Sequence, residues 1–151
     1  MSEIRVSVVI DATPAQVWAD VEHVASHVEW MADAEAIRFL SDQHQGVGTT
    51  FECDTKVGPL RLTDVMEITE WEPGARMGVR HVGLVTGTGV FTLAPVGDSA
   101  TAFTWTEDLR FPWWMGGPVG GVVGGRIMRW IWKRNLTALK ARIESTDRTA
   151  G

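Results

Sequence analysis

Residues 8–18 are Val8-Val9-Ile10-Asp11-Ala12-Thr13-Pro14-Ala15-Gln16-Val17-Trp18, and this stretch decides the start of the fold. The apolar residues that lead into it alternate from Ile4 to Ile10, which is typical of a half-buried strand. Thr13 can then cap a helix, Pro14 suits the first helical position, and Gln16 stands three residues beyond the cap. The stretch therefore predicts a strand that leads directly into a short helix ending near residue 22.

The residues that follow predict a second short helix over 24–31 and then only strands. The strands are expected at 34–43, 49–57, 60–71, 76–82, 86–94 and 100–111. Short turns such as Gly58-Pro59 and Glu72-Pro73-Gly74 separate them, so they should form an antiparallel meander.

The C-terminal part has helical periodicity instead. Apolar residues recur at spacings of three and four along residues 126–145, namely Met128, Ile131, Trp132, Leu136, Leu139 and Ile143. One long helix is expected there, with Met128, Ile131, Leu136 and Leu139 facing the sheet. Residues 1–146 should form one domain, and residues 147–151 a frayed tail.

The composition limits the classes of partner. The chain of 151 residues has a formal net charge of −5, which argues against a nucleic-acid partner. Residues 126–142 nevertheless carry six basic residues and no acid, so this segment is either a solvated helix face or a surface for anions or membranes. No apolar signal region or long apolar run is present, and a cytoplasmic location is expected.

The aromatic and cysteine contents are also informative. The chain has eight tryptophans, five phenylalanines and no tyrosine. Some tryptophans should therefore line a cavity or a contact surface. Cys53 is the single cysteine, so an intrachain disulfide is impossible, and a buried packing role is expected.

The order of elements resembles the START-like (SRPBCC) superfamily, on its polyketide cyclase/dehydrase-like branch. Four segments carry the resemblance: residues 8–18, His27-Val28-Glu29-Trp30, Glu70-Trp71-Glu72-Pro73-Gly74, and residues 136–144. The resemblance implies an α+β helix-grip fold. In that fold a curved antiparallel seven-stranded sheet wraps around the long C-terminal helix, and two short helices lie between the first and second strands.

The resemblance also implies a cavity between the sheet and the long helix, so that one face of each strand supplies ligand-binding side chains. On the predicted faces these are Phe51, Leu62, Met66, Met77, Val79, Phe103, Trp105 and Leu109. Trp113 and Trp114 follow the last strand within the glycine-rich stretch 111–125. Either these glycines pass under the curved sheet where side chains would clash, or the stretch forms a gate over the cavity with Trp113, Trp114 and Met115 as its apolar lip.

Three ionisable residues, Asp64, His81 and Glu107, fall on the same apolar faces. A buried carboxylate without a partner is costly, so His81 is its expected partner. The group is either structural, as a satisfied polar pair at the pocket rim or as a facing direction that a bulge shifts by one residue, or an acid–base site. In the second case Glu107 and His81 form the acid–base pair, and Asp64 sets the charge. The chain departs from the aromatic polyketide cyclases here, because it lacks the tyrosine that they commonly place in the pocket.

Three functions remain open from the sequence. The first is binding or transport of an apolar small molecule of the lipid, polyketide or isoprenoid class. The second is a polyketide cyclase/dehydrase-like enzyme that uses acid–base chemistry without metal or cofactor, and the third is a protein-interaction module. A membrane or an acyl carrier is a further candidate for transient contact, whereas the oligomeric state is left open. An apolar cavity with one polar end favours binding, and ionisable groups that converge on one bound atom favour catalysis.

Overall fold

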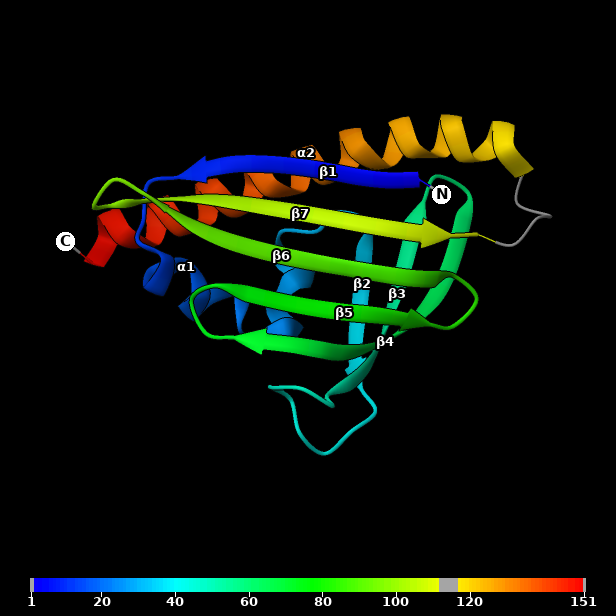
Figure 1. Cartoon of the computed structure of the whole chain (residues 1–151), viewed down its shortest axis with the longest axis horizontal. Coiled ribbons are helices and arrows are strands. Elements are labelled where there is room, and N and C mark those ends of the chain that lie inside the picture. Colours follow the sequence, from blue (N-terminus) through cyan, green and yellow to red (C-terminus); the bar gives the residue numbers. More distant parts are fainter. Residues whose placement is uncertain (1, 112–116, 151) are drawn as a thin grey trace.

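The first strand and helix form as the opening stretch predicts. A computed structural model describes residues 2–111 and 117–150 of the chain (Figure 1). Strand β1 spans Ser2–Ile10, and helix α1 spans Pro14–Val21. The Thr13 hydroxyl accepts a hydrogen bond from the Gln16 backbone N–H at 3.2 Å, and the Gln16 side chain accepts one from the Thr13 N–H at 2.8 Å. This capping box fixes the point at which the helix begins.

Seven strands form one antiparallel sheet in the order β1-β7-β6-β5-β4-β3-β2. The six later strands are β2 (Ala34–Phe39), β3 (Thr50–Val57), β4 (Leu60–Glu72), β5 (Arg76–Val82), β6 (Thr86–Val96) and β7 (Ala100–Arg110). The pairing shifts register at Ala34/Ala36 and at Ile68/Glu70. Such irregularities bend a strand, and Figure 1 shows β2 and β3 running steeply across the direction of β5, β6 and β7. The sheet is therefore curled, as the helix-grip prediction requires.

The long C-terminal helix α2 spans Gly117–Ala150 and lies along the sheet (Figure 1). Leu136 and Leu139 are almost completely buried, and Met128 and Ile131 pack partly buried against the core, so the predicted helix face is confirmed. The tail expected at 147–151 is helical as far as Ala150, and the helix begins nine residues before the predicted residue 126.

Two other boundaries differ from the prediction. The second short helix, expected over 24–31, is a 3-10 helix, η1, which spans Val24–Glu29 and ends two residues early. Strand β2 ends at Phe39 and does not reach Gln43. The Gln43 side chain instead donates hydrogen bonds to the backbone oxygens of Gln45 and Val47, which holds residues 43–47 in a turn that alternation alone does not reveal.

Polar contacts fix α2 to the acidic N-terminal segment. Arg142 lies 3.0 Å from an Asp20 carboxylate oxygen and 2.6 Å from a Glu29 carboxylate oxygen. Buried Asn135 donates to Asp33 at 2.8 Å. Arg142, at the end of the basic segment 126–142, therefore has a structural role. This role distinguishes it from the basic residues nearer the start of the helix.

Candidate functional site

An apolar cavity of about 140 Å³ lies between the curled sheet and α2. Its walls come from η1, from the segment 31–37, from strands β3 to β7 and from α2. Apolar cavities of roughly this size, about 150 Å³, can remain free of water and hold a molecule the size of benzene. The space therefore suits an apolar ring or a short apolar segment.

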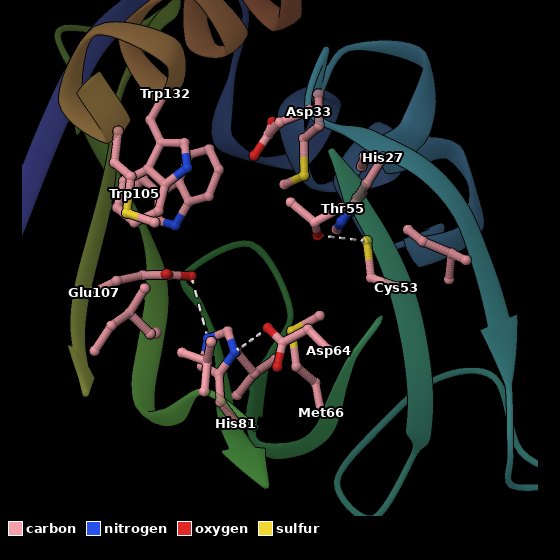
Figure 2. A pocket seen from close by; sticks show the side chains of 18 of the residues that line it. His27, Asp33, Cys53, Thr55, Asp64, Met66, His81, Trp105, Glu107 and Trp132 are labelled. Carbon is pink, nitrogen blue, oxygen red and sulfur yellow. Dashed lines mark hydrogen bonds and ion pairs between the residues drawn. The ribbon is translucent and has the colours of Figure 1, made fainter. Parts of the chain in front are cut away.

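The three ionisable residues predicted on the apolar strand faces meet on one wall of this cavity (Figure 2). The Nδ1 atom of His81 lies 2.6 Å from the Asp64 Oδ2 atom, which is a short hydrogen bond. Its Nε2 atom lies 3.5 Å from Glu107 Oε1, within ion-pair range but without the alignment of a hydrogen bond. His81 and Glu107 are almost fully buried, and Asp64 is partly buried. The imidazole is thus placed between two carboxylates.

Glycines in β6 allow this contact across an intervening strand. His81 on β5 pairs with Gly87, and Glu107 on β7 pairs with Gly89. A Cβ atom on Gly89 would lie only 2.7 Å from Glu107 Oε1. Because β6 has no side chain at these positions, His81 and Glu107 reach toward each other over its backbone. The local sequence does not reveal this role, because it depends on pairing with two strands that are distant from each other along the chain.

The charges of this group follow from its surroundings. Burial lowers the pKa of His81, but the hydrogen bond to Asp64 and the nearby Glu107 carboxylate outweigh it and raise that pKa to about 10. His81 is therefore an imidazolium at neutral pH. Among the described residues, the buried Asp64 Oδ1 and His81 Nε2 atoms have no hydrogen-bond partner. Within the described part of the chain, the wall thus contains one acceptor and one charged donor whose hydrogen-bonding capacity is unused.

Aromatic side chains form the wall next to the charged group. The Trp105 and Trp132 rings stack with centroids 4.7 Å apart and an interplanar angle of 18°. Phe91 packs edge-on against Trp105, with centroids 5.3 Å apart. Trp105, Trp132 and Phe91 all line the cavity, so a flat apolar ligand would meet aromatic surface on this side.

The opposite wall carries polar side chains that sequence analysis did not assign to the site. Figure 2 shows His27, Asp33, Cys53 and Thr55 across the cavity from Trp105 and Glu107. His27 lies 2.8 Å from the Val21 carbonyl oxygen, and burial lowers its pKa to about 4, so its ring is neutral and Nε2–H donates this bond. His27 lies on a short 3-10 helix and Asp33 on a turn, so the periodicities of an α-helix or a strand do not predict which way their side chains face.

The thiol on this wall is unreactive in character. Burial raises the pKa of Cys53 to about 11, and the Thr55 hydroxyl lies 3.8 Å from its sulfur. A thiol that stays protonated is a poor nucleophile. This agrees with the expectation of a buried packing residue, although Cys53 also faces the cavity.

Most of the residues predicted as ligand-binding lie on the cavity wall. These are Phe51, Leu62, Met66, Met77, Val79, Trp105 and Leu109. Phe103 does not, because it is fully buried in the core beside Phe91 and is separated from the cavity. Trp113 and Trp114 lie outside the described residues, as does the proposed lip.

Two further features concern cofactors and membranes. Nowhere in residues 2–111 and 117–150 do three or more histidine, cysteine or acidic side chains form a group suited to a metal ion. Within the same part of the chain, no helix has an apolar stretch of the length and hydropathy needed to cross a membrane.

The chain matches a known protein family. Residues 1–144 match the family model described as "Polyketide cyclase / dehydrase and lipid transport". None of the curated proteins matches the sequence at a significant level.

Solved structures share the fold at low identity. A protein from Thermus thermophilus has a TM-score of 0.83 at 16% identity, covering 96% of this chain and 99% of its own. The ZhuI aromatase/cyclase from a Streptomyces species has a TM-score of 0.82 at 16% identity, with 99% and 98% covered. A START superfamily protein from Mycobacterium smegmatis has a TM-score of 0.76 at 12% identity, with 95% and 98% covered.

Proposed function

Because the chain belongs to the polyketide cyclase/dehydrase and lipid transport family, we propose that it binds an apolar small molecule bearing a hydrogen-bonding oxygen. The observation that carries the proposal is the cavity, whose walls are apolar except for two polar groups on opposite sides. The apolar walls exclude charged or sugar-like ligands, since these would lose hydration without replacement. The family and the fold support a ligand in this space.

The Asp64–His81–Glu107 group gives the ligand an orientation. The Asp64 Oδ1 atom, which lacks a hydrogen-bond partner among the described residues, accepts a hydrogen bond from a ligand hydroxyl, and His81 Nε2 donates one to a hydroxyl or carbonyl oxygen. A ring held against Trp105 brings its oxygen substituent to this group. Ligands that lack such an oxygen leave buried polar atoms unpaired, which costs about 1–3 kcal/mol.

Native mass spectrometry of the purified protein tests the proposal first, because a carried ligand adds a discrete mass. Tryptophan fluorescence provides the second test. An added apolar ligand should quench or shift the emission of the wild type, and Trp105→Phe should lose most of that response. Trp130→Phe is the matched control, since Trp130 is 60% exposed and faces away from the cavity. Binding of no apolar molecule by either method would refute the proposal.

A second candidate function is acid–base catalysis on the bound molecule, of the cyclase or dehydrase type. The observation that favours it is the convergence of two carboxylates on one cavity-facing imidazole. With a pKa of about 10, His81 is a weak acid at neutral pH. Its role is to stabilise negative charge on a carbonyl oxygen by hydrogen bonding, while the Glu107 carboxylate accepts the proton from carbon.

Glu107→Gln separates the two functions. The variant keeps the shape of the side chain and removes its charge. In an enzyme it should lower turnover by about 10²–10⁴-fold, the usual reach of one general base, with little change in ligand affinity. If the variant turns over at the wild-type rate, or loses ligand affinity rather than turnover, the catalytic function is rejected and only the binding function remains.

A further inference from the structure

The outer face of α2 near its start combines exposed apolar residues with unpaired cations. Trp130 is 60% exposed and Ile127 is 46% exposed. At 100° per residue, positions 126, 127, 129, 130, 133 and 134 fall within less than half of the helix circumference. The cations on this face are Arg126, Arg129, Lys133 and Arg134, all exposed. In the described part of the chain none of the four has a carboxylate partner within ion-pair distance.

The β3–β4 turn continues this surface beside the helix. Leu60 at the turn is 43% exposed, and Lys56 and Arg61 are exposed on either side of it. Lys56 and Arg134 line one groove between the turn and the helix. We call the surface formed by Lys56, Leu60, Arg61 and the outer face of α2 from Arg126 to Arg134 the basic rim. Figure 1 shows the β3–β4 turn and the first half of α2 at the same end of the molecule.

The charge of the basic rim contrasts with that of the rest of the chain. The protein has a net charge of −5, yet residues 126–142 contain no acid. Asp33 is the acidic side chain that lines the groove, and it accepts a hydrogen bond from Asn135. The rim is therefore a localised positive surface, which would attract an anionic partner over about one Debye length.

We propose that the basic rim docks on an anionic lipid bilayer surface. Trp130 has the position typical of an interfacial tryptophan, with the Arg134 guanidinium 4.8 Å from its ring centroid. Trp130, Ile127 and Leu60 would enter the headgroup region, and the surrounding cations would contact lipid phosphates. The apolar side chains stand apart on two elements rather than in one flat patch, which suits insertion between lipids better than packing on a protein.

The basic rim lies next to the internal cavity. Val57 and Ile131 line both the groove at the rim and the internal cavity. The docked face therefore lies one layer of side chains from the ligand space. An apolar ligand could pass between bilayer and cavity at this place, although the docking itself stands independently of any ligand.

Vesicle co-sedimentation tests the proposal with the full chain. Wild-type protein should bind vesicles of phosphatidylcholine with about one-third phosphatidylglycerol at low salt, and should be released by high salt. It should bind pure phosphatidylcholine much less. The double variant Arg126→Gln/Arg129→Gln should lower the partition coefficient by about tenfold or more, since each cation near an anionic surface contributes substantially.

Matched controls separate docking from general surface effects. Trp130→Ala should weaken binding several-fold, whereas Val47→Ala should leave it unchanged, because Val47 is 61% exposed but lies in the β2–β3 turn, away from the rim. Thermal unfolding should confirm that all variants fold. No binding of the wild type to anionic vesicles, or equal loss in the rim and Val47 variants, would overturn the proposal. Binding to an acidic protein without vesicle binding would overturn it as well.

Discussion

His81 shows how one side chain carries the electrostatics of the site. An imidazole on an apolar strand face would normally be neutral, because burial favours the uncharged form. Here Asp64 at 2.6 Å and Glu107 at 3.5 Å hold it in the charged form. Two carboxyl groups thus flank one positive charge. In the proposed binding mode, a ligand oxygen would therefore accept a hydrogen bond from a proton that the two carboxyl groups hold on His81.

The raised pKa of His81 predicts a pH dependence of stability. Its folded-state pKa of about 10 exceeds the ordinary value of 6.5. The stabilisation is complete below about pH 6.5 and is lost as the pH rises toward 10. Urea unfolding over this range should show a falling free energy of unfolding, and the fall should end at a lower pH in Glu107→Gln. An NMR titration in which wild-type His81 titrates near 6.5 would contradict the assignment.

The lowered pKa of His27 predicts that stability changes with pH in the direction opposite to the effect of His81. Burial lowers its pKa from 6.5 to about 4, so the folded protein resists protonation of this ring. The unfolded chain binds the proton first, and stability should fall as the pH is lowered from about 6.5 to 4. His27→Gln keeps a side chain able to donate to the Val21 carbonyl, and it should flatten this part of the curve. If the stability of His27→Gln falls between about pH 6.5 and 4 as steeply as that of the wild type, other groups cause the fall.

At the scale of single elements, strand alternation predicted which side chains face the cavity but not how deep they lie. Alternation places Asp64, His81 and Glu107 on one side, and the structure brings them together. The same rule put Phe103 in the ligand space, yet Phe103 lies in the closed core beside Phe91. Depth depends on which element covers the strand at each point, and that is a property of the tertiary fold.

A substitution in strand β6 tests the contact between His81 and Glu107. Gly89→Ala would add a Cβ atom 2.7 Å from Glu107 Oε1, so the carboxylate must move. Because the Glu107 side chain is flexible, we expect a modest loss of stability and a clear fall in the pKa of His81, measured by NMR. Combined with Glu107→Gln, the Gly89→Ala change should have no further effect on that pKa. Equal effects of Gly89→Ala in both backgrounds would mean that the glycine does not act through Glu107.

Helix α2 predicts a large cost for truncating its buried face. Leu139 is completely buried against the sheet, and Leu139→Ala should lower the free energy of unfolding by about 2–5 kcal/mol. Leu40→Ala removes the same atoms from a side chain that is 56% exposed, and it should change stability by less than about 0.5 kcal/mol. Urea denaturation of the two variants compares them directly. Similar costs at both positions would mean that the helix face is misassigned.

At the scale of the whole molecule, local signals in the sequence predicted the elements, and the resemblance to a known superfamily predicted their arrangement and one half of the candidate site. The capping box at Thr13, the strand faces and the apolar spacing in α2 are local signals, and each specified its element. The wall that carries His27 and Asp33 was missed because a 3-10 helix and a loop position it through long-range contacts such as that of Asn135 with Asp33. The β6 glycines were missed because their role depends on two strands that are distant in sequence.

Because the cavity is apolar, a side chain that fills it should raise the stability of the domain and at the same time prevent ligand binding. An unfilled apolar space forfeits packing contacts, so a larger side chain that fills it should stabilise the empty protein. Leu62 lines the cavity and pairs with Thr55 on the neighbouring strand, where Leu62→Trp would direct an indole into the space. We expect an unchanged or raised melting temperature without ligand.

The same variant should lose the response to ligand. In the wild type, an apolar ligand at about 100 times its dissociation constant should add roughly 2.7 kcal/mol of stability, seen as a rise in melting temperature. Leu62→Trp should lose most of that rise because the indole occupies the ligand space. Val9→Trp is the control, since Val9 is 52% exposed on β1, and it should keep the full rise. A ligand-induced rise that is equal in all three proteins would place the ligand outside this cavity.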